Sequence, residues 1–239
     1  MKKQILLTTL VLISFQLFAQ QNFVNVINSE ITPKNKHFFQ QQVTSTNIAT
    51  QFNATYDYGL GKGFEFGANI WLMNIKYKPF STITNTTLNN EPIAPTMMLN
   101  GAKLFNINEN HSVTLGGQYG SSLTRPSFKN SLGLTYINYK VKNLIIPNSI
   151  LVLGSFYNSK TYGGNGNRFG TWIGLDFPIS KQFSFVGESI LGSNYISTSC
   201  IGIVYSPKPH LPLTFAVQLP NNHNTITSFV FELTILPKN

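Results

Sequence analysis

The residue types that usually carry out catalysis or bind metals are few in this sequence and widely separated. The four histidines, His37, His111, His210 and His223, show no metal-ligand spacing, and the single cysteine, Cys200, cannot complete a zinc pattern. Cys200 has no basic residue close in sequence that would favour its thiolate, so we expect a small residue inside a strand. The sequence therefore predicts no metal site, no cofactor and no disulfide.

A hydrolase is the enzyme class that most needs consideration. His223 lies near Ser228 and among several asparagines, which is the arrangement closest to a Ser–His pair with an orienting amide. No nucleophile motif surrounds any serine, and Asn-rich turns are common because the Asn side chain bonds to nearby backbone. We therefore do not expect an enzyme. A lipid-modifying enzyme at the rim of the molecule is kept as a third hypothesis.

Polar and apolar side chains alternate along most of the chain, which is typical of strands with one wet and one apolar face. Over residues 47–58, Phe52 and Tyr56 lie on one face and Asn53 and Asp57 on the other. A glycine-rich turn leads to a second strand at 64–77, in which we expect Trp71 and Met73 on the polar face and Leu72 on the apolar face. We place further strands at 97–105, 112–122, 131–141, 149–159, 168–177, 183–192, 198–206, 212–219 and 226–236, with a weakly patterned first strand at 37–43.

These strands predict an all-β fold, a closed antiparallel up-and-down transmembrane β-barrel of about twelve strands, with ten strands as the alternative. A soluble β-sandwich is the competing fold. A sandwich needs a charged outer surface, yet charged residues are 10% of this sequence against roughly 25% in ordinary soluble domains. Sheets that cross lipid must be closed, because lipid cannot satisfy an open strand edge.

A second indication is the resemblance to small, mostly uncharacterised outer-membrane barrels of the Bacteroidota, which are porin-like or transporter-like. Their turns resemble residues 56–67 of this chain, which read Tyr-Asp-Tyr-Gly-Leu-Gly-Lys-Gly-Phe-Glu-Phe-Gly. Exported proteins of that group also have signal ends similar to Leu17-Phe18-Ala19 followed by two glutamines. The resemblance implies a barrel in the cell outer membrane and implies no catalytic residue.

The chain divides into three parts. Residues 1–19 predict a cleaved signal peptide, since Lys2 and Lys3 precede a short apolar run and Ala19 supplies a small residue at the cut. Residues 20–36 are expected to form an N-terminal periplasmic segment, and residues 37–239 the barrel.

The chain has an excess of basic residues, with 17 Lys and Arg against 8 Asp and Glu, and this excess limits which partners it can bind. The cations occur singly in turns and loops and form no stripe, so nucleic acid is not an expected partner. Those at the predicted outer loops suit outer-membrane lipid and lipopolysaccharide. They are Lys78, Arg125, Lys129, Lys160 and Arg168.

The inner face of the predicted barrel is the candidate functional surface. Alternation places there the candidate lumen-lining residues Asn53, Asn69, Trp71, Gln118, Trp172, Glu188, Gln218 and Glu232. Uncharged polar groups beside two tryptophans favour a narrow channel or facilitator for a small hydrophilic or amphipathic solute. The alternative is a structural or interaction barrel with a closed lumen, which binds a partner through outer loops such as the long Lys78–Thr96 connection. Glu188 and Glu232 either set an ion preference in the lumen or hydrogen-bond across the interior and close it.

Overall fold

The computed structural model describes residues 22–83, 92–124, 131–223 and 226–238. The predicted signal peptide lies outside the described residues, as do Arg125 and Lys129. Besides one short helix, α2 (Lys160–Gly163), the described elements are strands. They are β1 (His37–Ser45), β2 (Ala49–Gly61), β3 (Phe64–Tyr77), β4 (Phe80–Ile83), β5 (Thr96–Asn106), β6 (His111–Ser122), β7 (Leu132–Lys142), β8 (Ile150–Asn158), β9 (Phe169–Pro178), β10 (Phe183–Leu191), β11 (Thr198–Tyr205), β12 (Leu213–Pro220) and β13 (Ser228–Ile235).

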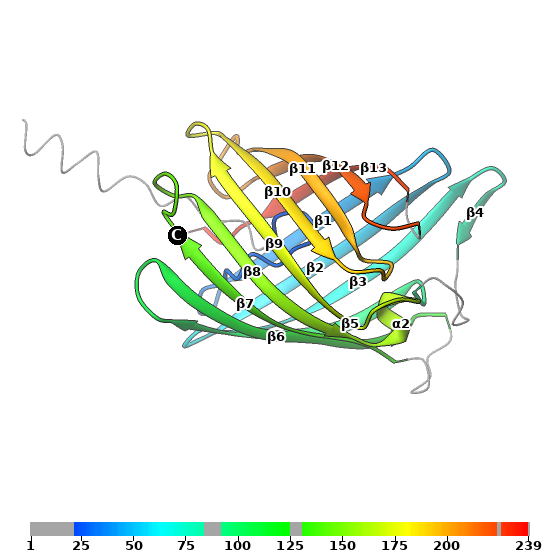
Figure 1. Ribbon diagram of the computed structural model, residues 1–239, viewed down its shortest axis with the longest axis horizontal. Helices are drawn as coiled ribbons and strands as arrows, with labels where there is room; N and C mark the ends of the chain where they lie inside the picture. Colours follow the sequence, from blue (N-terminus) through cyan, green and yellow to red (C-terminus); the bar gives the residue numbers. More distant parts are fainter. Residues whose placement is uncertain (1–21, 84–91, 125–130, 224–225, 239) are drawn as a thin grey trace, which may run out of the picture.

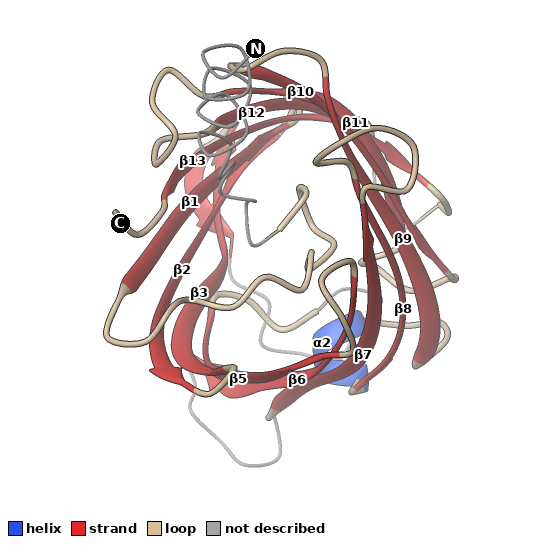
Figure 2. Ribbon diagram, turned by 90° about the vertical axis from the view of Figure 1, so that its left-hand side faces the viewer, coloured by secondary structure: helices blue, strands red, loops and turns tan. Residues whose placement is uncertain are grey.

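The strands close into a barrel (Figures 1 and 2). Each wall strand pairs antiparallel with the next, and β1 pairs with both β2 and β13, so that the first and last strands seal the sheet. In the described sheet, β4 pairs only with the last residues of β3, which extend beyond the barrel wall. β4 is therefore not a wall strand, and twelve strands form the barrel. The prediction of a closed antiparallel barrel of twelve strands is confirmed, and the weakly patterned first strand is part of it.

The two ends of the barrel differ in their connections. The turn end carries connections 62–63, 107–110, 143–149, 179–182 and 206–212, and the loop end carries 46–48, 78–95, 123–131, 159–168, 192–197 and 221–227. The tight turn after β2 uses left-handed backbone, with φ of 88° at Gly61 and 76° at Gly63. Glycine adopts that conformation without a steric cost, which explains the glycine-rich sequence there.

The outer wall is apolar and the inner wall is largely polar. In β13, Phe229 is 70% exposed on the outside, whereas Val230 and Glu232 are 3% and 0% exposed on the inside. Exposed aromatic side chains lie toward both ends of the outer wall. Tyr56, Phe64, Phe66, Phe105 and Phe183 lie toward the turn end, and Tyr77, Tyr119, Tyr157, Phe169 and Phe229 lie toward the loop end. An aromatic belt at the edge of an apolar band is typical of barrels that span a membrane.

One part of the predicted alternation is wrong. After Trp71 the faces of β3 exchange, so that Leu72 is 2% exposed on the inside and Met73 is 47% exposed on the outside. The cause is a bulge, because the register of β2 and β3 shifts between Phe52 and Ala54, and Leu72 has a positive φ of 59°. A bulge inserts an extra residue and reverses the faces that follow it.

The N-terminal segment lies elsewhere than expected. We predicted residues 20–36 as an N-terminal periplasmic segment, whereas the structure places residues 22–32 inside the wall (Figure 2) and residues 33–36 at the turn end. We call residues 22–36 the lumenal segment. Phe23, Val24 and Val26 are almost fully buried there. Burial against the inner wall removes these apolar side chains from water, which a free periplasmic segment could not do.

Candidate solute site in the barrel lumen

The lumenal segment is a hairpin inserted from the turn end. Its later part leaves beside the β2–β3 turn, where Asn35 N–H donates to the Gly59 carbonyl at 2.8 Å. Its tip is a tight turn in which Asn22 pairs with Ile27 and Phe23 N–H donates to the Val26 carbonyl at 2.9 Å. Within the described residues, the segment therefore runs from this tip inside the lumen to the turn end of the barrel.

The tip of the hairpin is held by the carboxylate of Glu188 in β10. Backbone N–H groups of Val24, Asn25 and Val26 donate to its two oxygens at 2.8–3.0 Å. Glu188 is buried and has little access to water, so these N–H donors supply the hydrogen bonds that its carboxylate needs. Asn25 Nδ2 also lies 3.2 Å from Cys200 Sγ and donates to Gln218 Oε1 at 3.0 Å.

A second anchor is an ion cluster lower in the lumen. Glu30 lies 2.8 Å from the Lys140 ammonium and 2.9 Å from that of Lys142, both on β7. Lys140 is buried and also donates to the Ser29 carbonyl at 3.1 Å. Burial opposes the charged form of Glu30, but the two ammonium groups outweigh it and hold the pKa of this carboxyl below its ordinary value. The cluster therefore fixes the base of the hairpin to the wall.

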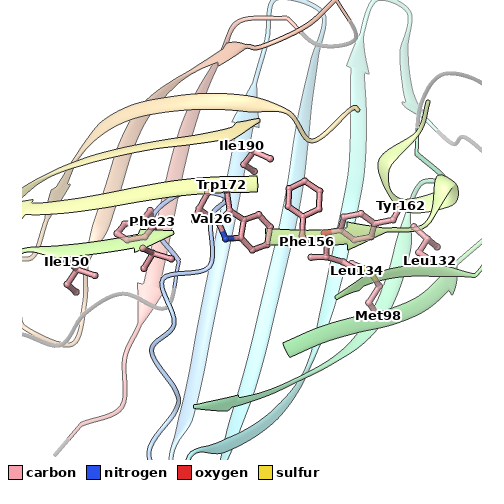
Figure 3. Packing of buried hydrophobic residues seen from close by; sticks show 11 residues of the cluster. Phe23, Val26, Met98, Leu132, Leu134, Ile150, Phe156, Tyr162, Trp172 and Ile190 are labelled. Atoms are coloured by element: carbon pink, nitrogen blue, oxygen red, sulfur yellow. The ribbon is translucent and has the colours of Figure 1, made fainter. Parts of the chain in front are cut away.

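Apolar contacts complete the docking (Figure 3). Phe23 and Val26 belong to a buried cluster with wall residues that include Ile150 and Trp172. Gly174 of β9 makes room for this contact, because a Cβ there would lie 2.3 Å from the Phe23 ring. The hairpin is thus held by a carboxylate, an ion cluster and an apolar plug together.

A cavity of about 390 Å³ lies between the tip of the hairpin and the loop end of the barrel. Its floor includes Asn25 and Ile27 of the lumenal segment, and its wall continues to Thr46, Ile48 and Ile226 near the rim of the loop end. Within the described part of the chain, none of the residues that line this cavity is charged. The volume falls within the roughly 300–1,000 Å³ of typical ligand pockets.

Amide side chains from several strands form two hydrogen-bonded groups at the cavity wall. Asn69 Nδ2 donates to Gln118 Oε1 at 2.7 Å and Asn100 Nδ2 to Asn69 Oδ1 at 2.8 Å. Asn53 Nδ2 donates to Gln42 Oε1 at 2.8 Å, and Asn53 Oδ1 accepts the Leu72 N–H that the β3 bulge turns inward. These bonds hold the amide groups in fixed orientations.

Aromatic side chains lie beside the amides. α2 folds back from the loop end and brings Tyr162 onto Trp71, with ring centroids 4.5 Å apart and planes 15° from parallel. Trp172 stacks on Phe156 at 4.9 Å and donates from Nε1 to Asn138 Oδ1 at 2.6 Å. Both tryptophans of the chain therefore lie in the cavity wall in fixed positions.

The eight predicted lumen-lining residues divide into two groups. Six line the cavity, namely Asn53, Asn69, Trp71, Gln118, Trp172 and Gln218. Glu188 and Glu232 point inward but do not line it, since Glu188 binds the hairpin and Glu232 is fully buried beside Thr214. Of the two roles considered for these acids, the structure favours internal hydrogen bonding. Sequence reasoning missed Glu30, Lys140 and Tyr162.

A smaller cavity of about 70 Å³ continues from the first along one side of the hairpin. The two share lining residues on the wall of β2, β3 and β6, among them Thr55, Asn69 and Gln118. On the hairpin side they share Asn22 and Ile27.

The described residues offer no metal site and no Ser–His pair. They contain no group of His, Cys, Asp and Glu that could hold a metal ion, and no helix long and apolar enough to cross a membrane. His223 is exposed and makes no hydrogen bond to a serine of the described chain, while Asn221 and Asn222 donate to the carbonyls of Ile190 and Asn194. The described part of this loop thus holds no Ser–His pair.

The closed twelve-strand barrel is a fold that this chain shares with solved outer-membrane porins. The barrel is similar to the KdgM porin, solved in complex with disordered oligogalacturonate, with a TM-score of 0.57 at 8% identity over 84% of this chain and 99% of that one. It is also similar to the NanC porin, with a TM-score of 0.56 at 10% identity over 85% of this chain and all of that one. No family model and no curated protein sequence matches the chain. At these identities the likeness is one of fold alone, and the resemblance to Bacteroidota barrels stays a prediction.

Proposed function

We propose that this protein is an outer-membrane barrel that passes small hydrophilic solutes through its lumen, and that the lumenal segment controls their passage. The apolar outer wall with its aromatic belt supports a membrane location. Lys78, Lys160 and Arg168 are exposed at the loop end, which suits contact with lipopolysaccharide. The porin-like fold is consistent with both parts of the proposal.

The observation that carries the proposal is a polar cavity that reaches the loop end and is floored by a separable piece of chain. The wall of a purely structural barrel has no need of a neutral cavity of about 390 Å³. The floor is made by the hairpin of residues 22–36, which is continuous with β1 at its C-terminal end and is otherwise held by non-covalent contacts such as those of Glu188 and Lys140. Movement of that hairpin would open the lumen from end to end.

Conductance in planar bilayers tests this proposal. We expect the full chain to give rare, brief openings and a variant lacking residues 22–31 to give frequent or lasting ones. Heat-modifiable gel mobility shows whether each variant has a folded barrel. A folded deletion variant that never conducts at any voltage would contradict the proposal.

A closed structural barrel is the second candidate, and the strength of the two anchors favours it. Glu188 and the Glu30 cluster hold the hairpin at points far apart along its length. On this account the hairpin never leaves, and the deletion variant loses thermal stability without gaining conductance. The same bilayer experiment therefore separates the two candidates.

A further inference from the structure

We propose that the cavity above the hairpin is a binding site for neutral saccharides, an inference that rests on the proposed solute path and names the class of solute. The first reason is the absence of charge, since none of the described lining residues is charged. A charged solute would lose hydration there without gaining a counter-ion, whereas a neutral solute avoids that cost. The site therefore selects against acidic and basic solutes.

The second reason is the hydrogen-bonding character of the wall. Each Asn or Gln side chain offers two donors and an acceptor, which matches a sugar hydroxyl that both donates and accepts. The amide side chains that line the cavity come from five strands and the lumenal segment. They are Asn22, Asn25, Gln40, Gln42, Gln51, Asn53, Asn69, Asn74, Gln118 and Gln218.

Two further polar atoms of the wall lack partners among the described residues. Asn74 Oδ1 and Ser228 Oγ are buried and accept or donate no hydrogen bond there, although both residues line the cavity. Unpaired buried polar atoms are costly, so a hydroxyl-bearing guest that reaches them removes a penalty as well as adding a bond.

The third reason is the aromatic surface beside these amides. Trp71 keeps part of its surface exposed in the cavity while Tyr162 stacks against it and fixes its orientation. A sugar ring has an apolar C–H face and a polar edge of hydroxyls. That shape fits a wall where an immobilised ring lies next to amides.

The two tryptophans make the test direct, because both lie in this wall and the chain has no others. The full-length protein in detergent is titrated with maltotriose, a neutral trisaccharide, and with trigalacturonate, its acidic counterpart, while tryptophan fluorescence and calorimetric heat are followed. We expect saturable binding of maltotriose and at least tenfold weaker binding of trigalacturonate.

Variants locate the binding site. We expect Trp71→Leu to weaken maltotriose binding by about tenfold and Gln51→Ala by a few-fold, each read by calorimetry and by the Trp172 fluorescence that remains. Tyr119→Leu removes an exposed aromatic side chain from the outer wall of β6 and serves as the control, with binding unchanged. Equal loss in the control, or no effect of Trp71→Leu, would place any binding outside the cavity and overturn the inference.

Conductance distinguishes this inference from the proposed function. In one contrary outcome the deletion variant opens and yet is not blocked by maltotriose, while the full-length protein shows no fluorescence change on titration. That pair of results would overturn the saccharide site and leave the channel standing. Trigalacturonate binding as tightly as maltotriose would also overturn it. Saturable maltotriose binding without conductance in any variant would support the site and defeat the channel.

Discussion

Replacing Glu188 by alanine tests the main anchor of the hairpin. The change removes the acceptor of three N–H groups, those of Val24, Asn25 and Val26. A buried donor without a partner costs about 1–3 kcal/mol. Val24 and Asn25 also line the cavity, so water can satisfy them in part, and we expect the docked hairpin to lose about 2–4 kcal/mol in all. Since about 1.4 kcal/mol is a factor of ten, the released fraction should rise by about 30-fold or more.

A cysteine on the hairpin reports this release. Ser29 is fully buried in the docked state, so the rate at which maleimide labels Ser29→Cys, in a Cys200→Ala background, follows the released fraction. We expect Glu188→Ala to raise the rate by about 30-fold or more. Glu109→Ala, which changes an exposed acid at the turn end, is the matched control and should leave the rate unchanged. Equal rates in the two variants would refute the reasoning.

Three further predictions concern the other contacts of the hairpin. Lys140→Ala leaves Glu30 with the more exposed Lys142 alone, so the barrel should lose about 1–3 kcal/mol, seen as a lower temperature of the gel-mobility shift, and adding Glu30→Gln should restore most of it. The pKa of Glu30 is lowered in the folded chain, so its stabilising effect is complete above the ordinary value of 4.5 and is lost as the pH falls through the lower folded value. Channel openings should therefore increase only below about pH 4.5, and this increase should be smaller in Glu30→Gln. Gly174→Ala places a Cβ 2.3 Å from the Phe23 ring and should speed maleimide labelling through a loss of about 1–3 kcal/mol, whereas Gly187→Ala meets Phe185 at an ordinary 3.5 Å and should not.

The barrel wall could be predicted because it depends on local alternation. One face of each strand meets an apolar environment and the other the lumen, so residues such as Phe229 and Glu232 carry the pattern within a few positions. The exception is the β3 bulge, where Leu72 turns inward. Nothing in the order of residues around it marks an extra residue, since the bulge depends on its pairing with Asn53 of β2.

The lumenal segment could not be predicted because its contacts are distant in sequence. Val26 binds Glu188 across 162 positions, and Glu30 binds Lys140 across 110. The run Phe23-Val24-Asn25-Val26 did offer an indication, since an apolar cluster directly after a predicted signal peptide needs burial somewhere. On β7, Lys140 lies on the same face as Leu132 and Leu134. Because that face carries both apolar and charged side chains, alternation did not indicate that Lys140 points into the lumen.

The central claim is that the lumen is a solute path closed by the hairpin, and a reversible lock tests it most directly. Asn25 Nδ2 lies 3.2 Å from the Sγ of Cys200, the one cysteine of the chain, so Asn25→Cys introduces a thiol that can form a disulfide with the wall. Single channels of this variant are recorded before and after addition of reductant, with Asn25→Ser as the control for the lost hydrogen bonds. We predict no openings while the disulfide is intact and openings on reduction, at the frequency that Asn25→Ser shows throughout. Openings of the oxidised variant equal to those of Asn25→Ser would contradict the claim that this hairpin closes the path.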